Sequence, residues 1–198
     1  MNADARALTL IVALVLLVAA PSVADAQTSA PRAGSFLYGL SGGVGNRSMR
    51  GTFQPPDFPR GASRPSPRQT VLALDLDGGF SLASRLAVFA RLEAGGAFVN
   101  NTPGHWGTLG LHAIARAWLT RRIWIEGGAG VTQLGYLPPP EVSVTASRWW
   151  APAQEGASGF EIFQGPHIAM SVLARYSTAM FDGLRANKVS VQVGHTGR

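Results

Sequence analysis

Regular alternation of apolar and polar side chains runs through residues 69–136 and constrains the fold more than any other feature. In QTVLALDLDGGFSL, Leu72, Leu74 and Leu76 fall on one face, whereas Asp75 and Asp77 fall on the other. The stretches RLAVFARLEAGGAF, WGTLGLHAIARAWL and RRIWIEGGAGVTQLGY repeat the pattern. Successive side chains of a strand point to opposite faces, so this period predicts sheet with two unlike sides. The stretches are longer than the usual strand of about five or six residues. They suit a tilted strand that crosses a bilayer, which needs roughly nine to eleven.

Four more extended segments bring the total to eight: 35–46 before the alternating region, and 156–163, 167–177 and 187–196 after it. The predicted connections after the first, third, fifth and seventh strands are longer, at 47–68, 100–104, 137–154 and 181–186. Those after the second, fourth and sixth are tight turns, at 83–84, 121–122 and 164–166. This asymmetry is typical of outer-membrane barrels. We therefore predict an all-β, eight-stranded antiparallel up-and-down transmembrane β-barrel.

The N-terminal segment predicts export. Arg6 precedes an apolar run over residues 8–20, and Ala24-Asp25-Ala26 offers a cleavage site of small residues. Cleavage after Ala26 divides the chain into a signal peptide (1–26), a lead-in (27–34) and a barrel domain (35–198). A retained anchor is the alternative, but the run is short of the roughly 20 residues that a spanning helix needs. The chain has no cysteine, so disulfides and thiolate metal sites are excluded.

The direction of the two faces decides between a membrane barrel and a soluble secreted, lipocalin-like barrel, which has the same alternation turned inside out. A solvent-facing surface is usually about a quarter to a third charged, whereas charged residues are only 14% of this chain. The polar face is mostly Gly, Ala, Ser and Thr, which suits the narrow interior of an eight-stranded barrel. We therefore predict that the aliphatic face meets lipid.

Glycine-patterned strands recur in SGGVG, DGGFSL, EAGGAF and EGGAGV, and GFEIFQGPHIAMSVLARYS reads as a late hairpin. In these features the chain resembles the small eight-stranded outer-membrane barrels of the OmpA/OmpX-like group. The resemblance covers residues 35–198. It implies a location in the outer membrane of a Gram-negative-type bacterium, insertion by the barrel-assembly machinery and a monomeric state.

Charged side chains on the polar face are predicted to meet inside the barrel. They are Asp75, Asp77, Arg91, Glu93, His112, Arg116, Glu126 and Arg175, accompanied by Gln192. Buried charges need partners, because an unpaired ion is very costly in a low dielectric. We interpret the set as a plug that closes the lumen, since eight strands leave no aqueous channel. A polar permeation or proton path is the alternative.

Signs of catalysis are weak. Some small outer-membrane barrels are lipid A hydrolases with a His-x-Ser-Asn type motif, but this chain offers His195-Thr196-Gly197. The four histidines lack the spacing of a metal site, and no nucleophile stands with a base and its orienting group. We predict no enzymatic activity, no cofactor and no metal. The indole of Trp124 falls on the lumen face, whereas Trp149 and Trp150 belong to the predicted loop 137–154.

Arginines are concentrated between the first two strands. The formal net charge is +6, and Arg47, Arg50, Arg60, Arg64 and Arg68 lie in one Gly/Pro/Ser-rich stretch. Guanidinium groups bind phosphates bidentately, so lipopolysaccharide is the predicted contact of this loop, with a merely solvated loop as the alternative. An exported chain makes nucleic acid an unsuitable partner. The resulting prediction is a structural or envelope-interaction role, with transport or binding of a small hydrophobic ligand as the alternative.

Overall fold

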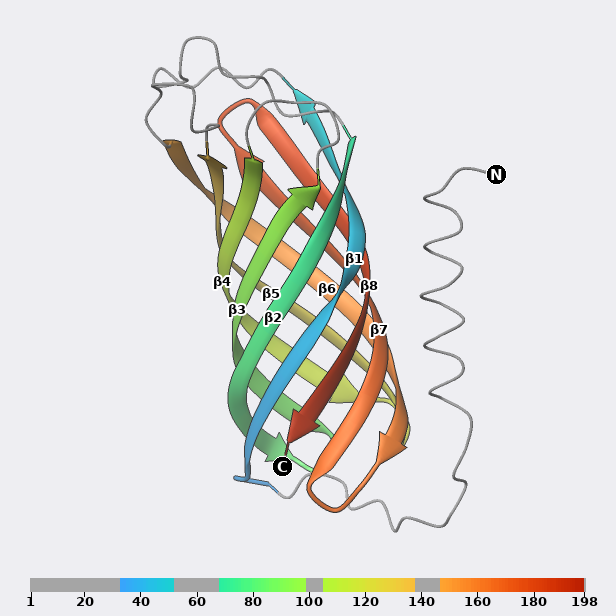
Figure 1. Ribbon diagram of the computed structural model, residues 1–198. Coiled ribbons are helices and arrows are strands. Elements are labelled where there is room, and N and C mark those ends of the chain that lie inside the picture. Colours follow the sequence, from blue (N-terminus) through green and yellow to red (C-terminus); the bar gives the residue numbers. More distant parts are fainter. Residues whose placement is uncertain (1–32, 52–67, 99–104, 138–146, 198) are drawn as a thin grey trace, which may run out of the picture.

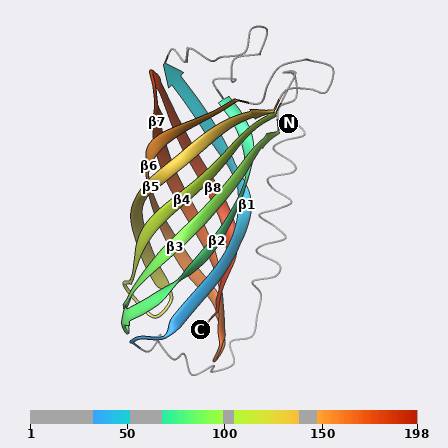
Figure 2. The same cartoon turned by 90° about the vertical axis from the view of Figure 1, so that its left-hand side faces the viewer.

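Eight antiparallel strands pair in chain order, and β1 also pairs with β8, which closes the barrel (Figure 1 and Figure 2). This computed structural model describes residues 33–51, 68–98, 105–137 and 147–197. The strands are β1 (Phe36–Gly51), β2 (Arg68–Ala83), β3 (Leu86–Phe98), β4 (His105–Trp118), β5 (Ile123–Leu137), β6 (Ser147–Gln164), β7 (Ile168–Phe181) and β8 (Leu184–Gly197). The prediction of an eight-stranded antiparallel up-and-down barrel is confirmed. The predicted signal peptide and the loop at 100–104 lie outside the described residues.

The two ends of the barrel differ. At one end, called the turn end, β1 begins beside the end of β8 (Figure 1). The turns after β2, β4 and β6 also lie here and occupy 84–85, 119–122 and 165–167. In the second of these turns, the Thr120 hydroxyl accepts hydrogen bonds from the backbone N–H groups of Arg122 and Ile123, at 3.2 and 3.0 Å. The opposite end, called the loop end, holds the end of β1 and the connection from β7 to β8.

The outward face of the wall is apolar. On β2, the side chains of Leu74 and Leu76 are 53% and 55% exposed, whereas Asp75 between them is 1% exposed. Outward Leu, Val, Ile and Phe side chains recur on the other strands in the same way. This is the reverse of a soluble lipocalin-like barrel and agrees with the predicted orientation. Among the described residues, no helix has the length and hydropathy to cross a membrane.

The interior is stacked in three layers. The loop-end apolar layer consists of Met49, Val71, Ala97, Trp106, Leu134, Tyr136, Ala151, Ala153, Ala179, Phe181, Leu184 and Ala186. The turn-end apolar layer consists of Leu37, Ala87, Phe89, Ile114, Trp118, Trp124 and Leu173. Between them lies the central polar layer described in the next subsection. The lumen is therefore filled mainly by packed apolar side chains above and below the central polar layer.

Two predicted loops are wrong where they meet strands. β1 continues to Gly51, so Arg47 belongs to a strand, and residues 52–67 lie outside the described part of the chain. β6 begins at Ser147 instead of residue 156, although Pro152 lies inside it. Pro152 is tolerated because β6 pairs there with β5, at Val131, and the described ladder with β7 starts only at Ala153. Proline has no backbone N–H, so it is tolerated in a strand at a position where no neighbouring strand needs a hydrogen bond from that group.

The predicted loop at 181–186 is also wrong. β7 ends at Phe181 and β8 begins at Leu184, so Asp182 and Gly183 alone make the connection. Gly183 has φ of 69°, a left-handed conformation that glycine adopts without steric cost. Asp-Gly between alternating segments is a strong hairpin signal. The alternation of long and short connections therefore does not extend to the last hairpin.

Glycines let the first and last strands approach each other at the closing seam. A Cβ atom on Gly43 would lie 2.0 Å from the carbonyl oxygen of Val191, and one on Gly45 would lie 2.3 Å from that of Val189. Both carbonyls belong to β8, and backbone atoms cannot rotate away. Gly42, the neighbour on the opposite face, would make only ordinary contacts at 3.7 Å. The seam therefore depends on the absence of side chains at the inward positions 43 and 45 of β1.

Replacement of Gly43 by valine should open this seam. We expect Gly43→Val to lower the free energy of unfolding by more than the about 1–3 kcal/mol of ordinary overpacking, because backbone oxygen stands where the side chain must go. Gly42→Val is the matched control and should change stability by less than about 1 kcal/mol. Urea titration of the protein folded in detergent gives both values. Equal losses for the two variants would contradict the seam argument.

Candidate functional site

The central polar layer is a set of buried ion pairs contributed by strands β2 to β8. Its charged members are Asp75, Asp77, Arg91, Glu93, Arg116, Glu126, Glu155, Arg175 and Lys188. His112, Ser41, Thr132 and Gln192 complete it with neutral hydrogen-bonding groups. All of these side chains point into the barrel and are buried. The layer crosses the whole lumen between the two apolar layers.

Arg91 on β3 is the centre of the layer and has no exposed surface. Its Nε and Nη2 atoms donate to both oxygens of Asp77, at 2.7 and 2.8 Å, in the bidentate geometry that favours arginine. Its Nη1 atom donates to Glu126 at 2.7 Å and to Glu155 at 2.9 Å. One guanidinium therefore joins carboxylates from β2, β5 and β6.

Two further arginines share Glu126 with Arg91. Arg116 donates from Nε and Nη2 to Glu126 Oε2, at 3.0 and 2.8 Å, and its guanidinium lies over the Trp124 ring, 4.2 Å from the centroid. Arg175 donates to Glu126 Oε1 at 3.0 Å and forms an ion pair with Asp75. Trp124 belongs to the turn-end apolar layer, so its inward position agrees with its place in the sequence pattern.

Glu93, His112 and Lys188 form the side of the layer nearer the loop end. Lys188 forms an ion pair with Glu93 Oε1. His112 Nε2 lies 4.0 Å from Glu93 Oε2 and 3.3 Å from the Thr132 hydroxyl. Both contacts use the same ring nitrogen. A catalytic triad needs the acid and the nucleophile on different nitrogens, so this arrangement lacks triad geometry.

The structure brings all eight predicted lumen residues and Gln192 into this one layer. Sequence reasoning missed Glu155 because it falls between the predicted loop 137–154 and the predicted strand 156–163. It missed Lys188 although Lys188 lies on the inward face of a predicted strand. Glu161 was also missed; it lies toward the turn end, where its Oε1 accepts a hydrogen bond from the Trp118 indole at 2.8 Å. Because β6 begins at Ser147, the alternation of its side chains places Glu155 and Glu161 inside the barrel.

The predicted arginine loop is only partly a loop. Arg47 is buried inside the barrel, where its Nε donates to Gln69 Oε1 at 2.9 Å and its Nη2 to the Trp106 carbonyl at 3.4 Å. It therefore cannot contact lipopolysaccharide from a loop, because β1 is longer than predicted and turns this side chain inward. Arg50 is exposed near the end of β1, and Arg68 is exposed at the start of β2. Arg60 and Arg64 lie outside the described residues.

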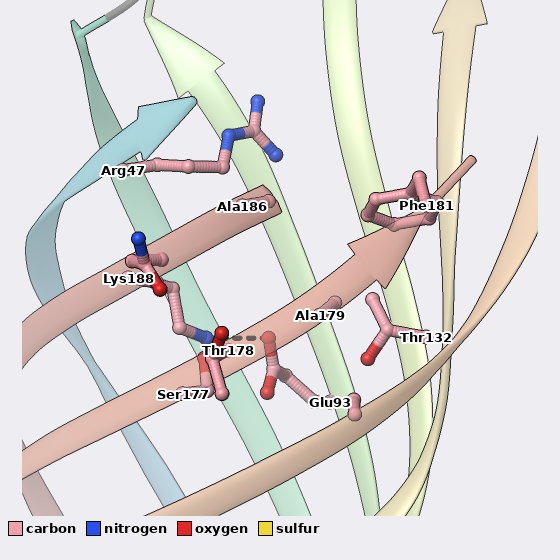
Figure 3. A pocket seen from close by; sticks show the side chains of 11 residues that line it. Arg47, Glu93, Thr132, Ser177, Thr178, Ala179, Phe181, Ala186 and Lys188 are labelled. Atoms are coloured by element: carbon pink, nitrogen blue, oxygen red, sulfur yellow. Dashed lines mark hydrogen bonds and ion pairs between the residues drawn. The ribbon is translucent and has the colours of Figure 1, made fainter. Parts of the chain in front are cut away.

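A small pocket of about 20 Å³, room for about one water molecule, lies between the central polar layer and the loop-end apolar layer (Figure 3). Arg47, Glu93, Thr132 and Lys188 line its polar side. Its apolar side includes Phe181 and the alanines 153, 179 and 186. Figure 3 shows the ion pair of Lys188 and Glu93 on its wall. Nearby, Trp149 stacks on Trp106 with centroids 6.0 Å apart, whereas Trp150 is exposed.

Comparison with solved structures identifies the architecture. The chain superposes on Ail, the attachment invasion locus protein of Yersinia pestis, in complex with the heparin analogue sucrose octasulfate. The TM-score is 0.58 at 10% sequence identity, over 82% of this chain and 99% of Ail. It superposes on Neisserial surface protein A with a TM-score of 0.56 at 9% identity, over 81% of this chain and 97% of that protein. This chain has the fold of the small outer-membrane barrels.

The resemblance to the outer-membrane barrels is one of fold, at identities near the level of unrelated sequences. No protein-family model matches the sequence, and a search of curated proteins found no match. The sequence resemblance to this barrel group is thus confirmed by architecture.

Removal of the central guanidinium tests the energetic role of the layer. We expect Arg91→Met to lower the free energy of unfolding by about 3–5 kcal/mol, because three buried carboxylates each lose a partner. Arg85→Met, at an exposed arginine on the β2–β3 turn, is the control and should cost less than about 0.5 kcal/mol. Urea titration in detergent measures both. A small effect at Arg91 would mean that the remaining cations compensate for its loss.

Proposed function

We propose that the protein is a non-enzymatic component of the bacterial outer membrane, with a structural or envelope-interaction role. In this proposal the barrel spans the membrane and its lumen is closed to solutes. The observation that carries the proposal is the central polar layer, in which Arg91 and its neighbours fill the cross-section with buried ion pairs. Eight strands leave an interior just wide enough for side chains to fill. A closed lumen favours a role at the membrane surface over passage of solutes through the barrel.

The outward face supports the membrane location. Large apolar side chains are exposed on every strand of the barrel, including Leu40, Leu76, Leu92, Leu111, Ile125, Phe160, Tyr176 and Val191. A soluble protein rarely leaves so large an apolar surface in water. The predicted signal peptide of residues 1–26 supplies a route of export. Insertion by the barrel-assembly machinery and a monomeric state belong to the same proposal.

Enzymatic activity has little support in the lumen. The hydroxyl in contact with a buried histidine is that of Thr132, at 3.3 Å from His112 Nε2. The imidazole lacks a carboxylate on its other nitrogen, Nδ1, and the group lies buried in the barrel. A nucleophile needs a base that is itself oriented by a third group and a place for substrate. Neither condition is met here.

Binding or transport of a small hydrophobic ligand is the second candidate, and the loop-end apolar layer is the observation that favours it. The pocket beneath that layer is bounded by Phe181 and several alanines. Transport, however, needs an exit, and both the closed β1–β8 ladder and the central polar layer oppose one. Ligand binding at the mouth is compatible with this structure, whereas passage through the barrel is not favoured.

Contact with lipopolysaccharide is the interaction that we propose for the loop end. Arg50 on β1 and Arg185 on β8 are directly opposite in the ladder, and both are exposed on the outer side of the wall. Like charges in such a pair repel, and a bridging phosphate would relieve the repulsion through charge-assisted hydrogen bonds. Arg68, exposed at the start of β2, lies at the same end, and Arg60 and Arg64 precede it in the sequence. Ail carries a polysulfated ligand in its complex, which gives a precedent for polyanion binding on this fold.

Electrophoresis and planar-bilayer recording test the closed membrane barrel together. We expect unboiled protein from the outer-membrane fraction to migrate faster than boiled protein, and purified protein to give no stable conductance steps. A packed lumen leaves no continuous water path, which is the reason for the second expectation. A soluble periplasmic protein without heat-modifiable mobility would overturn the membrane assignment. Reproducible single-channel steps would overturn the closed lumen and leave the assignment intact.

Substitution of the outward arginine pair tests the lipid contact. We expect Arg50→Gln combined with Arg185→Gln to weaken binding of purified lipopolysaccharide several-fold, because two charge-assisted contacts are lost. The matched control is Arg121→Gln combined with Arg122→Gln, an exposed pair on the turn between β4 and β5. Surface plasmon resonance with detergent-solubilised protein measures the affinities at fixed ionic strength. Equal losses for the two double variants would indicate a general effect of net charge.

A further inference from the structure

Three metal-ligating side chains converge inside the barrel from three different strands. Glu93 on β3, His112 on β4 and Glu155 on β6 offer ligand atoms that all lie within 4.8 Å of one another. Glu93, His112 and Glu155 are exposed by only 3%, 2% and 7%. Two carboxylates and one imidazole form a donor set that divalent transition-metal ions accept. The sequence shows no sign of this set, because its members are far apart in the chain.

The hydrogen bonding of the two glutamates points to a ligand between them. Glu93 is held through Oε1 by Lys188, and Glu155 is held through Oε1 by Arg91 at 2.9 Å. The second oxygen of each carboxylate, Oε2, is buried and has no hydrogen-bond partner within the described strands. Leaving a buried charged oxygen unsatisfied is costly. In metal sites, ligating carboxylates are themselves oriented by outer hydrogen bonds of this kind.

The imidazole also faces the cluster. His112 Nε2 lies 4.0 Å from Glu93 Oε2 and 3.3 Å from the Thr132 hydroxyl, so this is the ring nitrogen placed to bind an ion. The charged members of the central layer that the structure describes are five carboxylates and four cationic side chains. Arg47 lines the same pocket as Glu93 and adds a fifth cation, so the preference for a metal cation rests on the donor atoms of the two carboxylates and the imidazole and not on an excess of negative charge.

We propose that Glu93, His112 and Glu155 bind a divalent transition-metal ion of the zinc class. The ion takes one carboxylate oxygen from each glutamate and one nitrogen from the imidazole. Tetrahedral bonds of about 2.0–2.2 Å place two ligand atoms roughly 3.3–3.6 Å apart. Ligand atoms that now lie up to 4.8 Å apart therefore approach by about an ångström to close the site, through rotation of the two glutamate side chains. The pocket of Figure 3 is lined by Glu93 and by Thr132, the hydroxyl neighbour of His112. A water in that pocket supplies the remaining position. The site is independent of the proposed function and joins β3, β4 and β6 beneath the loop-end apolar layer.

Titration calorimetry of the metal-free barrel, folded in detergent, with Zn²⁺ tests the proposal. Co²⁺ absorption provides a second signal, because the spectrum reports the ligand geometry. The informative variants are Glu155→Gln and His112→Gln. Glu155→Gln leaves Arg91 paired with Asp77 and Glu126, so the layer should survive it. The matched control is Glu161→Gln, the same substitution at a buried lumen glutamate outside the cluster. Heat-modifiable mobility verifies the fold of each protein before titration.

We expect one Zn²⁺ per chain in the unaltered protein and in Glu161→Gln. Affinity should fall at least about tenfold in Glu155→Gln and in His112→Gln, since loss of an outer-shell contact alone weakens metal sites by about 10–100-fold. Two results would overturn the proposal. One is an unaltered protein that is folded and binds no Zn²⁺. The other is binding that persists unchanged in both variants, which would assign the ion to surface groups such as His167 or His195.

Discussion

Charge neutralisation inside a narrow barrel is the condition on which the rest of this structure depends. Seven strands contribute charged side chains to one layer, and Arg91 alone joins Asp77, Glu126 and Glu155 from three of them. A buried ion without a partner is far more costly than a surface ion, so each strand is held in the register that brings its charge to the layer. Because a slip by one residue turns every side chain to the other face, the same condition fixes the outward aliphatic band.

The two apolar layers shield the central polar layer from water at both ends of the barrel. Trp106, Tyr136 and Phe181 on one side, and Trp118, Trp124 and Phe89 on the other, separate the ion pairs from both ends of the barrel. Water is thereby limited, and electrostatic interactions are stronger where the effective dielectric is low. The barrel therefore has an apolar outer face, and its interior consists of an apolar layer, the central polar layer and a second apolar layer. Such an interior suits an anchor that presents its loop end to the surroundings better than it suits a conduit.

Period-two alternation was sufficient to predict the strands that carry it, their orientation and eight members of the polar layer. It failed where other signals intervened. Pro152 and the prolines before it favoured a loop, because sequence alone does not show that β6 extends past the ladder with β7 at that point; Glu155 was lost with it. Arg47 was assigned to a loop by the composition of its neighbours, although its inward position continues the alternation of Ser41, Gly43 and Gly45. Asp182-Gly183 was a readable turn signal that was overlooked.

The meeting of Glu93, His112 and Glu155 depends on relative strand registers, which no local pattern encodes.

The glycine-lined junction of β1 with β8 has a consequence for the order of folding. Every other ladder joins strands that follow each other in the chain, whereas this one joins the two that are farthest apart. Contacts at great sequence separation form late, because the loop entropy must be lost first. Until β8 is in place, β1 keeps an open edge that can pair with another chain. Pairing of β1 with β8 is thus the folding step at which this chain is most exposed to misassembly. An assembly factor that covers the open edge of β1 would act at this step.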